Sequence, residues 1–300
     1  MKKFLAATSV IAASALLLAG CASATPTATK TAASAAGVDS AAAALLPDSY
    51  KTAGINVGSD IPYAPMEMFD TKNNPIGFDV DLANAIGVKL GVSIKFEKQA
   101  FDTLIPSLQA GKHDLAISSM SDTVERQKVL DFVDYFNGGA SLLVKAGNTS
   151  IKGIADLCGQ AAAAEAATWE VDLLKSQSDE CVKAGKKPIT IQNLPDDPSA
   201  LSAVKAGNAA AYLGDSQVVA YDVKNAGSGK DFALVIDPTN PNGYEAGLIG
   251  VGVLKKNTGL RDAVQAAVQA IMDDGTYDNL LTKWNLNSFK IESATVNGTK

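Results

Sequence analysis

Residues 101–121 read FDTLIPSLQAGKHDLAISSMS, and this stretch decides the fold class. Residues 103–110 have the apolar spacing of a short helix, with Pro106 in the first turn, where proline is tolerated. Residues 114–118 form an apolar run of strand length that ends in polar residues. A helix followed closely by such a strand is typical of an α/β layered domain.

The same alternation extends toward the amino terminus. One strand is predicted at residues 55–58 and another at residues 93–98. Between them, Asp79 or Asp81 can cap a helix whose apolar residues recur at helical spacing and which Gly91 terminates. The expected fold class is therefore α/β.

A second alternating series lies between two further predicted strands. One strand is expected at residues 139–147 and the other within residues 241–257. Downstream, residues 260–271 carry the apolar stripe of a long helix, and residues 275–284 predict a second helix. The two strands bracket the middle segment, and 300 residues leave room for two modest domains.

The amino terminus has the features of an export signal. Lys2 and Lys3 precede an apolar run over residues 4–19, which at about 16 residues is short for a membrane span. The LLAGC that follows resembles the lipobox of bacterial lipoproteins, in which the cysteine carries a diacylglyceryl group. By this resemblance residues 1–20 are a lipoprotein signal peptide and Cys21 is the membrane anchor. The alternative is a plain secretory signal.

Residues 21–49 are predicted to be a flexible tether, because they are rich in Ala, Thr and Ser and lack aromatic residues. Removal of residues 1–20 eliminates Lys2 and Lys3 and no acid, so the formal charge changes from −6 to −8. Such a surface repels nucleic acid, and no nucleic-acid partner is expected. The lipid must then hold the protein to the membrane.

The remaining cysteines, Cys158 and Cys181, form an even pair in a compartment that permits oxidation, so a disulfide is predicted. The chain has one histidine, His113, and no Cys-x-x-Cys, so neither a zinc cluster nor a histidine-based triad can be assembled. His113 is expected in a surface turn between a helix and a strand. No metal and no cofactor are expected.

Several segments resemble the family 3 periplasmic binding proteins, the polar amino-acid receptors of ATP-binding-cassette (ABC) importers. Residues 118–126, SSMSDTVER, resemble the ligand-binding turn of that family. The other similar segments, in the order of the family, are residues 60–67, 77–91, 101–121 and 274–286. The resemblance covers residues 50–290 and implies a two-lobed periplasmic-binding-protein-like fold of type II with two crossing hinge strands.

By this resemblance, lobe 1 comprises residues 50–139 and 248–290, and lobe 2 comprises residues 140–247. The two bracketing strands are then the hinges. Closure about them would bury a ligand between the lobes, driven by the higher affinity of the ligand for the closed state.

An α-amino acid presents a carboxylate and an ammonium, and the sequence contains a candidate for each. Arg126 offers a planar guanidinium that can pair both carboxylate oxygens, and it matches the arginine that the family uses. The alternative is an ordinary ion pair with Glu125 or Asp131. Asp215 matches the carboxylate that binds the α-ammonium in the family; the alternative is a simple helix cap.

Ser119 and Ser121 lie just past the carboxyl end of a predicted strand, where ligands bind in open α/β sheets. The spacing Asp122-x-x-Glu125 predicts a capped helix that starts there, with free backbone N–H groups facing an anion.

Three further residues match the side-chain pocket of the family. Asp60 and Tyr63 keep its Asp-x-x-Tyr spacing, and Phe101 opens the stretch quoted above. Tyr63 and Phe101 would form walls, or else belong to the core, and Asp60 could reach a distal polar group.

The sequence departs from the family at residues 164–170, AEAATWE, where a Gly-Thr-Thr turn is usual. Thr168 fits the first threonine, whereas Trp169 replaces the second. A ring in place of a hydroxyl would shrink the cavity or add a stacking face, so the identity of the ligand cannot be copied from a relative.

The resemblance implies a substrate-binding protein that captures an amino acid by hinge closure and delivers it to the permease of an ABC importer. It is expected to be an extracytoplasmic, lipid-anchored monomer and not an enzyme. A neutral or cationic amino acid is favoured, because Asp60, Asp215 and nearby Glu165 face Arg126 as the single cation.

The same fold also hosts a periplasmic dehydratase of cyclic acids and the sensor modules of receptors. For the enzyme, Asp60 or Glu165 is the suggestive acid or base. Both remain alternatives at this point.

Overall fold

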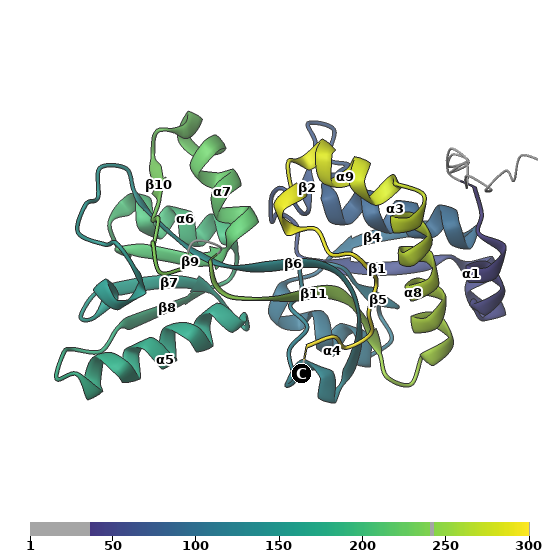
Figure 1. Ribbon diagram of the computed structural model, residues 1–300, viewed down its shortest axis with the longest axis horizontal. Coiled ribbons are helices and arrows are strands. Elements are labelled where there is room, and N and C mark those ends of the chain that lie inside the picture. Colours follow the sequence, from purple (N-terminus) through teal and green to yellow (C-terminus); the bar gives the residue numbers. More distant parts are fainter. Residues whose placement is uncertain (1–36, 241–242, 300) are drawn as a thin grey trace, which may run out of the picture. The chain divides into compact units, whose positions relative to one another are not determined.

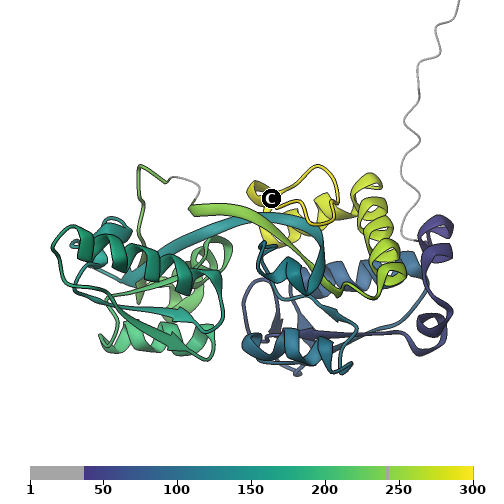
Figure 2. The ribbon, with the colours of Figure 1, turned by 90° about the horizontal axis from the view of Figure 1, so that it is seen from below.

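The computed structural model describes residues 37–240 and 243–299. Within them, nine strands form one mixed sheet in the order β4-β1-β5-β11-β6-β9-β7-β8, with β10 paired to β6. Two long strands, β6 (Leu130–Lys145) and β11 (Tyr244–Leu254), run side by side between two groups of elements, as Figures 1 and 2 show. We call these groups lobe 1 and lobe 2. No helix of the described residues is long and apolar enough to span a membrane.

Lobe 1 contains the amino-terminal and carboxy-terminal elements. They are α1 (Ser40–Leu45), α2 (Asp48–Ala53), β1 (Ile55–Ser59), β2 (Met68–Phe69), β3 (Pro75–Ile76), α3 (Phe78–Leu90), β4 (Ile94–Lys98), η1 (Phe101–Thr103), α4 (Leu104–Gln109), β5 (Leu115–Ala116), η2 (Arg126–Lys128), α8 (Thr258–Asp273), α9 (Thr276–Trp284) and η5 (Asn287–Phe289).

Lobe 2 contains the middle of the chain. Its elements are η3 (Ile154–Leu157), β7 (Ala161–Glu165), α5 (Trp169–Lys183), β8 (Thr190–Leu194), α6 (Asp197–Ala206), β9 (Ala211–Asp215), α7 (Ser216–Asn225), η4 (Ala226–Gly229) and β10 (Phe232–Leu234). Cys158 and Cys181 form a disulfide in this lobe, as predicted.

Parallel pairing brings strand ends together in each lobe. In lobe 1, β1 pairs in parallel with β4 and β5, so Asp60 after β1 lies near Ser118 after β5. In lobe 2, β7 pairs in parallel with β8 and β9, so the strand ends Glu165 and Asp215 lie at one edge. These edges are where ligands bind in open α/β sheets.

The two lobes have separate cores. Buried apolar side chains of lobe 1 gather around α3, α8 and α9 and, separately, around α4, whereas those of lobe 2 gather on the two faces of β7 and β9. Among the described residues, only Val218 of lobe 2 joins a lobe 1 cluster. Each lobe therefore has the core that it needs to move as a unit.

The crossing strands change register where they pass between the lobes. The pairing of β6 with β11 shifts between Tyr244 and Gly247, opposite Gly138 and Ala140. At Gly139, a Cβ atom would lie 2.7 Å from the carbonyl oxygen of Tyr244, so only glycine fits this close approach of the two backbones. The irregularity gives the strands a local bend at the crossing.

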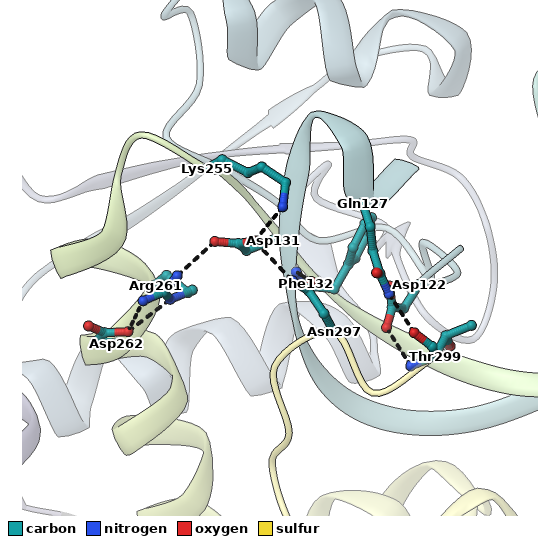
Figure 3. A network of polar contacts seen from close by, with 9 residues as sticks. All are labelled: Asp122, Gln127, Asp131, Phe132, Lys255, Arg261, Asp262, Asn297 and Thr299. Atoms are coloured by element: carbon teal, nitrogen blue, oxygen red, sulfur yellow. Dashed lines mark hydrogen bonds and ion pairs between the residues drawn. The ribbon is translucent and has the colours of Figure 1, made fainter. Parts of the chain in front are cut away.

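A carboxy-terminal segment, residues 291–299, lies along the start of β6 in lobe 1 (Figure 3). Asn297 accepts a hydrogen bond from Phe132 N–H and donates one to Asp131. Asp131 also pairs with Lys255 and Arg261 of the flanking elements. These donors outweigh the effect of burial and lower the pKa of Asp131. The network anchors the segment to lobe 1.

The tether expected over residues 21–49 is wrong for its last part. Residues 40–45 form α1, which Asp39 caps by accepting hydrogen bonds from Ala41 and Ala42 N–H. Ala42 and Leu46 are fully or almost fully buried against lobe 1. The composition did not indicate this helix. The buried face of an alanine helix can be recognised only when the surface against which it packs is known. Residues 1–36, with the predicted signal peptide and Cys21, lie outside the described residues.

Two further expectations for lobe 1 are corrected. His113 is not a surface residue: it is 3% exposed, its Nδ1 lies 2.8 Å from Ser107 Oγ, and Gly58 leaves the space that its ring occupies. Neither Asp79 nor Asp81 caps α3, because Gly77 holds that position. Asp79 is instead fully buried, and its carboxylate accepts a hydrogen bond from Ser119 N–H.

Candidate functional site

One cavity lies between the lobes and brings together all nine predicted ligand-binding residues. The residues that line it are Asp60, Tyr63, Phe101, Ser118, Ser119, Ser121, Arg126, Glu165, Thr168, Trp169, Glu170 and Asp215. Lobe 1 contributes the first seven and lobe 2 the other five. Within the described residues, no group of three or more His, Cys, Asp or Glu side chains is arranged to hold a metal ion.

Arg126 is the only cation among these twelve residues. Its guanidinium donates one hydrogen bond to Ser121 O at 2.9 Å, and one across the cavity to Ala167 O at 3.1 Å. It also lies over the Phe101 ring, 5.2 Å from the centroid. Burial lowers the pKa of Arg126, against the effect of Glu170 and Asp215.

The alternative partners of Arg126 are occupied by other cations. Glu125 pairs with Lys128, and Asp131 pairs with Lys255 and Arg261. Arg126 therefore does not form the solvated ion pair that would have made it an ordinary surface residue.

The helix predicted from Asp122-x-x-Glu125 is wrong, because only the three-residue turn η2 forms there. Asp122 does not cap a helix: its carboxylate accepts hydrogen bonds from Gln127 and from the Thr299 N–H of the carboxy-terminal segment (Figure 3). The chain must enter β6 at Leu130, which leaves room for a turn only. The turn is tied to β11 through Asp122 N–H and Leu248 O, at 2.8 Å.

Ser119 and Asp215 join the two lobes across the cavity. Ser119 Oγ donates a hydrogen bond to Asp215 Oδ2 at 2.9 Å, and Gln217 Nε2 donates to the same hydroxyl at 3.0 Å. Asp215 holds the capping position of α7, yet its side chain makes no capping hydrogen bond. The carboxylate is therefore turned to the cavity rather than to the helix.

A buried acid, Asp79, supports the loop that carries Ser119. Asp79 accepts hydrogen bonds from Ser119 N–H at 2.7 Å and from Tyr135 Oη at 2.8 Å. Ser119 has a φ of 45°, in the left-handed region that non-glycine residues rarely adopt, and these contacts hold it there. Burial raises the pKa of Asp79 to about 6.

Four acids line the cavity, two of them as a pair from different lobes. Asp60 and Glu165 are 5% and 4% exposed. Burial and the proximity of Asp60 raise the pKa of Glu165 to about 11, and burial also raises the pKa of Asp60. The other two, Glu170 and Asp215, both belong to lobe 2, and burial raises the pKa of each.

Aromatic side chains and Thr168 complete the lining. Tyr63 is 8% exposed, and Phe101 is partly buried. Trp169, the first residue of α5, lines the cavity and packs against the lobe 2 core. Thr168 Oγ1 donates to Glu165 O at 2.7 Å and so fixes the turn before the helix.

Three lining residues were not predicted as ligand contacts. Ser118 directly precedes the predicted Ser119, but its hydroxyl donates to Glu67 Oε1 at 2.6 Å and accepts from Asp60 N–H, so it supports the loop. The sequence indicates Glu165 only as a nearby acid or a candidate catalyst. Glu170 could have been recognised as a lining residue from its position in the first turn of the helix that follows Thr168.

Comparison with known proteins identifies the family. Residues 55–287 match the family described as bacterial extracellular solute-binding proteins, family 3. The fold and the cavity between its lobes agree with that match, and the chain belongs to this family. It is an amino-acid-binding protein of the ABC importer class.

Individual relatives point in the same direction. The chain is 26% identical to an arginine-binding protein of Corynebacterium glutamicum, over 85% of this chain and 82% of that protein. It is 31% identical to the ABC transporter arginine-binding protein 1 of Escherichia coli K12, over 77% and 90%. The solved structure of an ancestral arginine-binding protein bound to arginine matches with a TM-score of 0.68 and 32% identity, over 77% and 97%. These relatives are transport proteins, and the chain is likewise no enzyme.

Proposed function

We propose that this protein captures a neutral or cationic amino acid in the cavity between its lobes and delivers it to the permease of an ABC importer. The observation that carries the proposal is the opposition of Arg126 on lobe 1 and Asp215 on lobe 2 in one cavity. A guanidinium pairs both oxygens of the α-carboxylate, and a carboxylate accepts from the α-ammonium. Ser119, Ser121 and Thr168 supply further polar groups to the α-carbon end.

Contact with both ends of one ligand requires both lobes. The ligand therefore favours the closed arrangement and drives closure about β6 and β11 by its differential affinity. Tyr63, Phe101 and Trp169 form the walls of the side-chain pocket, and Asp60 reaches the distal end of the ligand side chain.

The charges of the cavity argue against a dicarboxylic ligand. Four carboxyl groups face a single guanidinium, which the α-carboxylate already engages. A second ligand carboxylate would be buried without a partner. Within the proposed class of neutral or cationic amino acids, a cationic ligand is supported by the relatives that are named as arginine-binding proteins.

Calorimetry with single amino acids tests the proposed ligand class. Arginine, lysine, histidine and glutamine are expected to include the tightest ligand, with glutamate and aspartate weaker than all of them. A thermal-shift screen gives an independent readout, since a ligand at 100 times its Kd stabilises the protein by about 2.7 kcal/mol. Tighter binding of glutamate than of these four amino acids would contradict the proposal.

A lipid on Cys21 is proposed to anchor the protein on the outer face of the cell membrane. The basis is the LLAGC sequence after the apolar run, because Cys21 lies outside the described residues. Cys21→Ala is expected to move the protein from the membrane fraction to the soluble fraction and to leave amino-acid affinity unchanged. Retention of the variant in the membrane pellet after fractionation would refute the anchor.

A further inference from the structure

We propose that Asp60 and Glu165 form one carboxyl pair that binds the distal cation of the ligand in exchange for a proton. This inference rests on the proposed function and deepens it, because the carboxyl pair would select amino acids whose side chain ends in a permanent positive charge. It assigns Glu165, from the lobe opposite Asp60, a direct part in ligand selection.

The geometry places two unpartnered acids together at one end of the cavity. Asp60 follows β1 in lobe 1, and Glu165 ends β7 in lobe 2. Asp60 Oδ2 and Glu165 Oε1 are buried and receive a hydrogen bond from no donor in the described part of the chain. The two carboxyl groups lie within hydrogen-bonding reach of each other. Two acceptors can bond only if a proton lies between them.

The surroundings of the pair are rich in carboxyl groups. The titratable groups that act on Asp60 from the neighbouring elements are Glu67, Asp102, Glu165, Asp196, Asp197 and the exposed Lys98. Those that act on Glu165 are Asp60, Tyr63, Glu170, Asp197 and Tyr212. Arg126 is the one cation in the cavity lining. The cavity lining therefore offers the pair no cation other than Arg126.

Electrostatics requires the pair to hold a proton until a cation arrives. Two buried like charges in contact cannot both ionise at neutral pH. Consistent with this, burial and the neighbouring Asp60 raise the pKa of Glu165 to about 11. A guanidinium or ammonium between the carboxyl groups would lower both pKa values, so that both ionise in the complex.

The exchange conserves charge within the cavity. The pair with one proton carries one negative charge, and the pair with two carboxylates and one ligand cation carries the same. The O–H bond of the Glu165 carboxyl breaks, its proton passes to the buffer, and N–H groups of the ligand take its place as donors. A neutral ligand such as citrulline, the ureido analogue of arginine, brings no charge and leaves the proton in place.

Calorimetry of the protein in several buffers of different ionisation enthalpy measures the protons released on binding. Arginine is expected to release about one proton more than citrulline, and its affinity relative to citrulline should rise by up to about tenfold per pH unit between about pH 6 and about pH 8. The relative affinity for arginine rises with pH because the pair holds its proton at lower pH, where the proton competes with the ligand cation. Any exchange at Glu170 and Asp215 affects both ligands alike and cancels in the difference.

Glu165→Gln removes the exchangeable proton and keeps the shape of the side chain. In this variant, the difference in proton release between arginine and citrulline is expected to fall to about zero, together with the difference in pH slope. Asp222→Asn is the matched control, because Asp222 is a buried acid of lobe 2 that does not line the cavity. The Asp222→Asn variant should keep the differences between arginine and citrulline in proton release and in pH slope.

The outcomes separate this inference from the proposed function. Equal proton release with arginine and citrulline, or an unchanged difference in Glu165→Gln, would overturn the exchange while amino-acid binding stands. If the protein bound neither arginine nor citrulline and no other amino acid, the proposed function would be overturned instead.

Discussion

Arg126→Ala is expected to weaken binding of the preferred amino acid by about 30-fold to several thousand-fold. Truncation of one member of a desolvated charge pair costs about 2 to 5 kcal/mol, chiefly because the other charge is left buried without a partner. Here that charge is the α-carboxylate of the ligand, and Arg126 is the one cation in the lining of the cavity.

Asp215→Asn is expected to have a smaller effect, since an amide oxygen still accepts a hydrogen bond from the α-ammonium. It would also retain an acceptor for Ser119 Oγ. Both variants should fold, because both side chains line the cavity rather than fill a core.

Titration calorimetry and melting temperature without ligand measure the two effects separately. Arg261→Ala is the matched control, because Arg261 lies on α8 and pairs with Asp131 outside the cavity. It should leave affinity unchanged. Near-native affinity in Arg126→Ala would make Arg126 an ordinary charge at the rim, and a collapsed melting temperature would make it structural.

Loss of the Cys158–Cys181 disulfide is expected to lower the free energy of unfolding by about 3 kcal/mol, because the closed loop restricts the unfolded chain. The two cysteines are 23 residues apart in the sequence. Cys158 lies just after η3, and Cys181 is a buried residue near the end of α5, so the bond ties the helix to the lobe 2 core.

Affinity for the ligand should change little in the double variant Cys158→Ala, Cys181→Ala. The cavity meets α5 at Trp169, and twelve residues of helix place Cys181 about 18 Å further along the axis. Denaturant unfolding of the variant and of the native protein measures the stability difference, and calorimetry measures affinity. Equal midpoints would show that the bond contributes nothing, and a large loss of affinity would show that it also positions Trp169.

Much of the site was predictable because its residues follow strands whose ends meet. Asp60 and Ser119 come after β1 and β5, and Asp215 ends β9, so parallel pairing alone brings them to the sheet edges. Local pattern also predicted α8 and α9. It failed at Asp122, where the spacing of a helix cap occurs in a segment too short for a helix.

The sequence by itself determined the α/β class, the alternation of elements, the disulfide and the residue types at the strand ends, because periodicity and strand termination are properties of neighbouring residues. Only the tertiary structure decided which groups are buried together. His113 is buried because Gly58, 55 positions earlier, leaves space for its ring. Glu165 meets Asp60 across the two lobes, and the pKa of each depends on that distant neighbour. Burial and charge pairing arise from contacts between residues far apart in the chain, which no local pattern records.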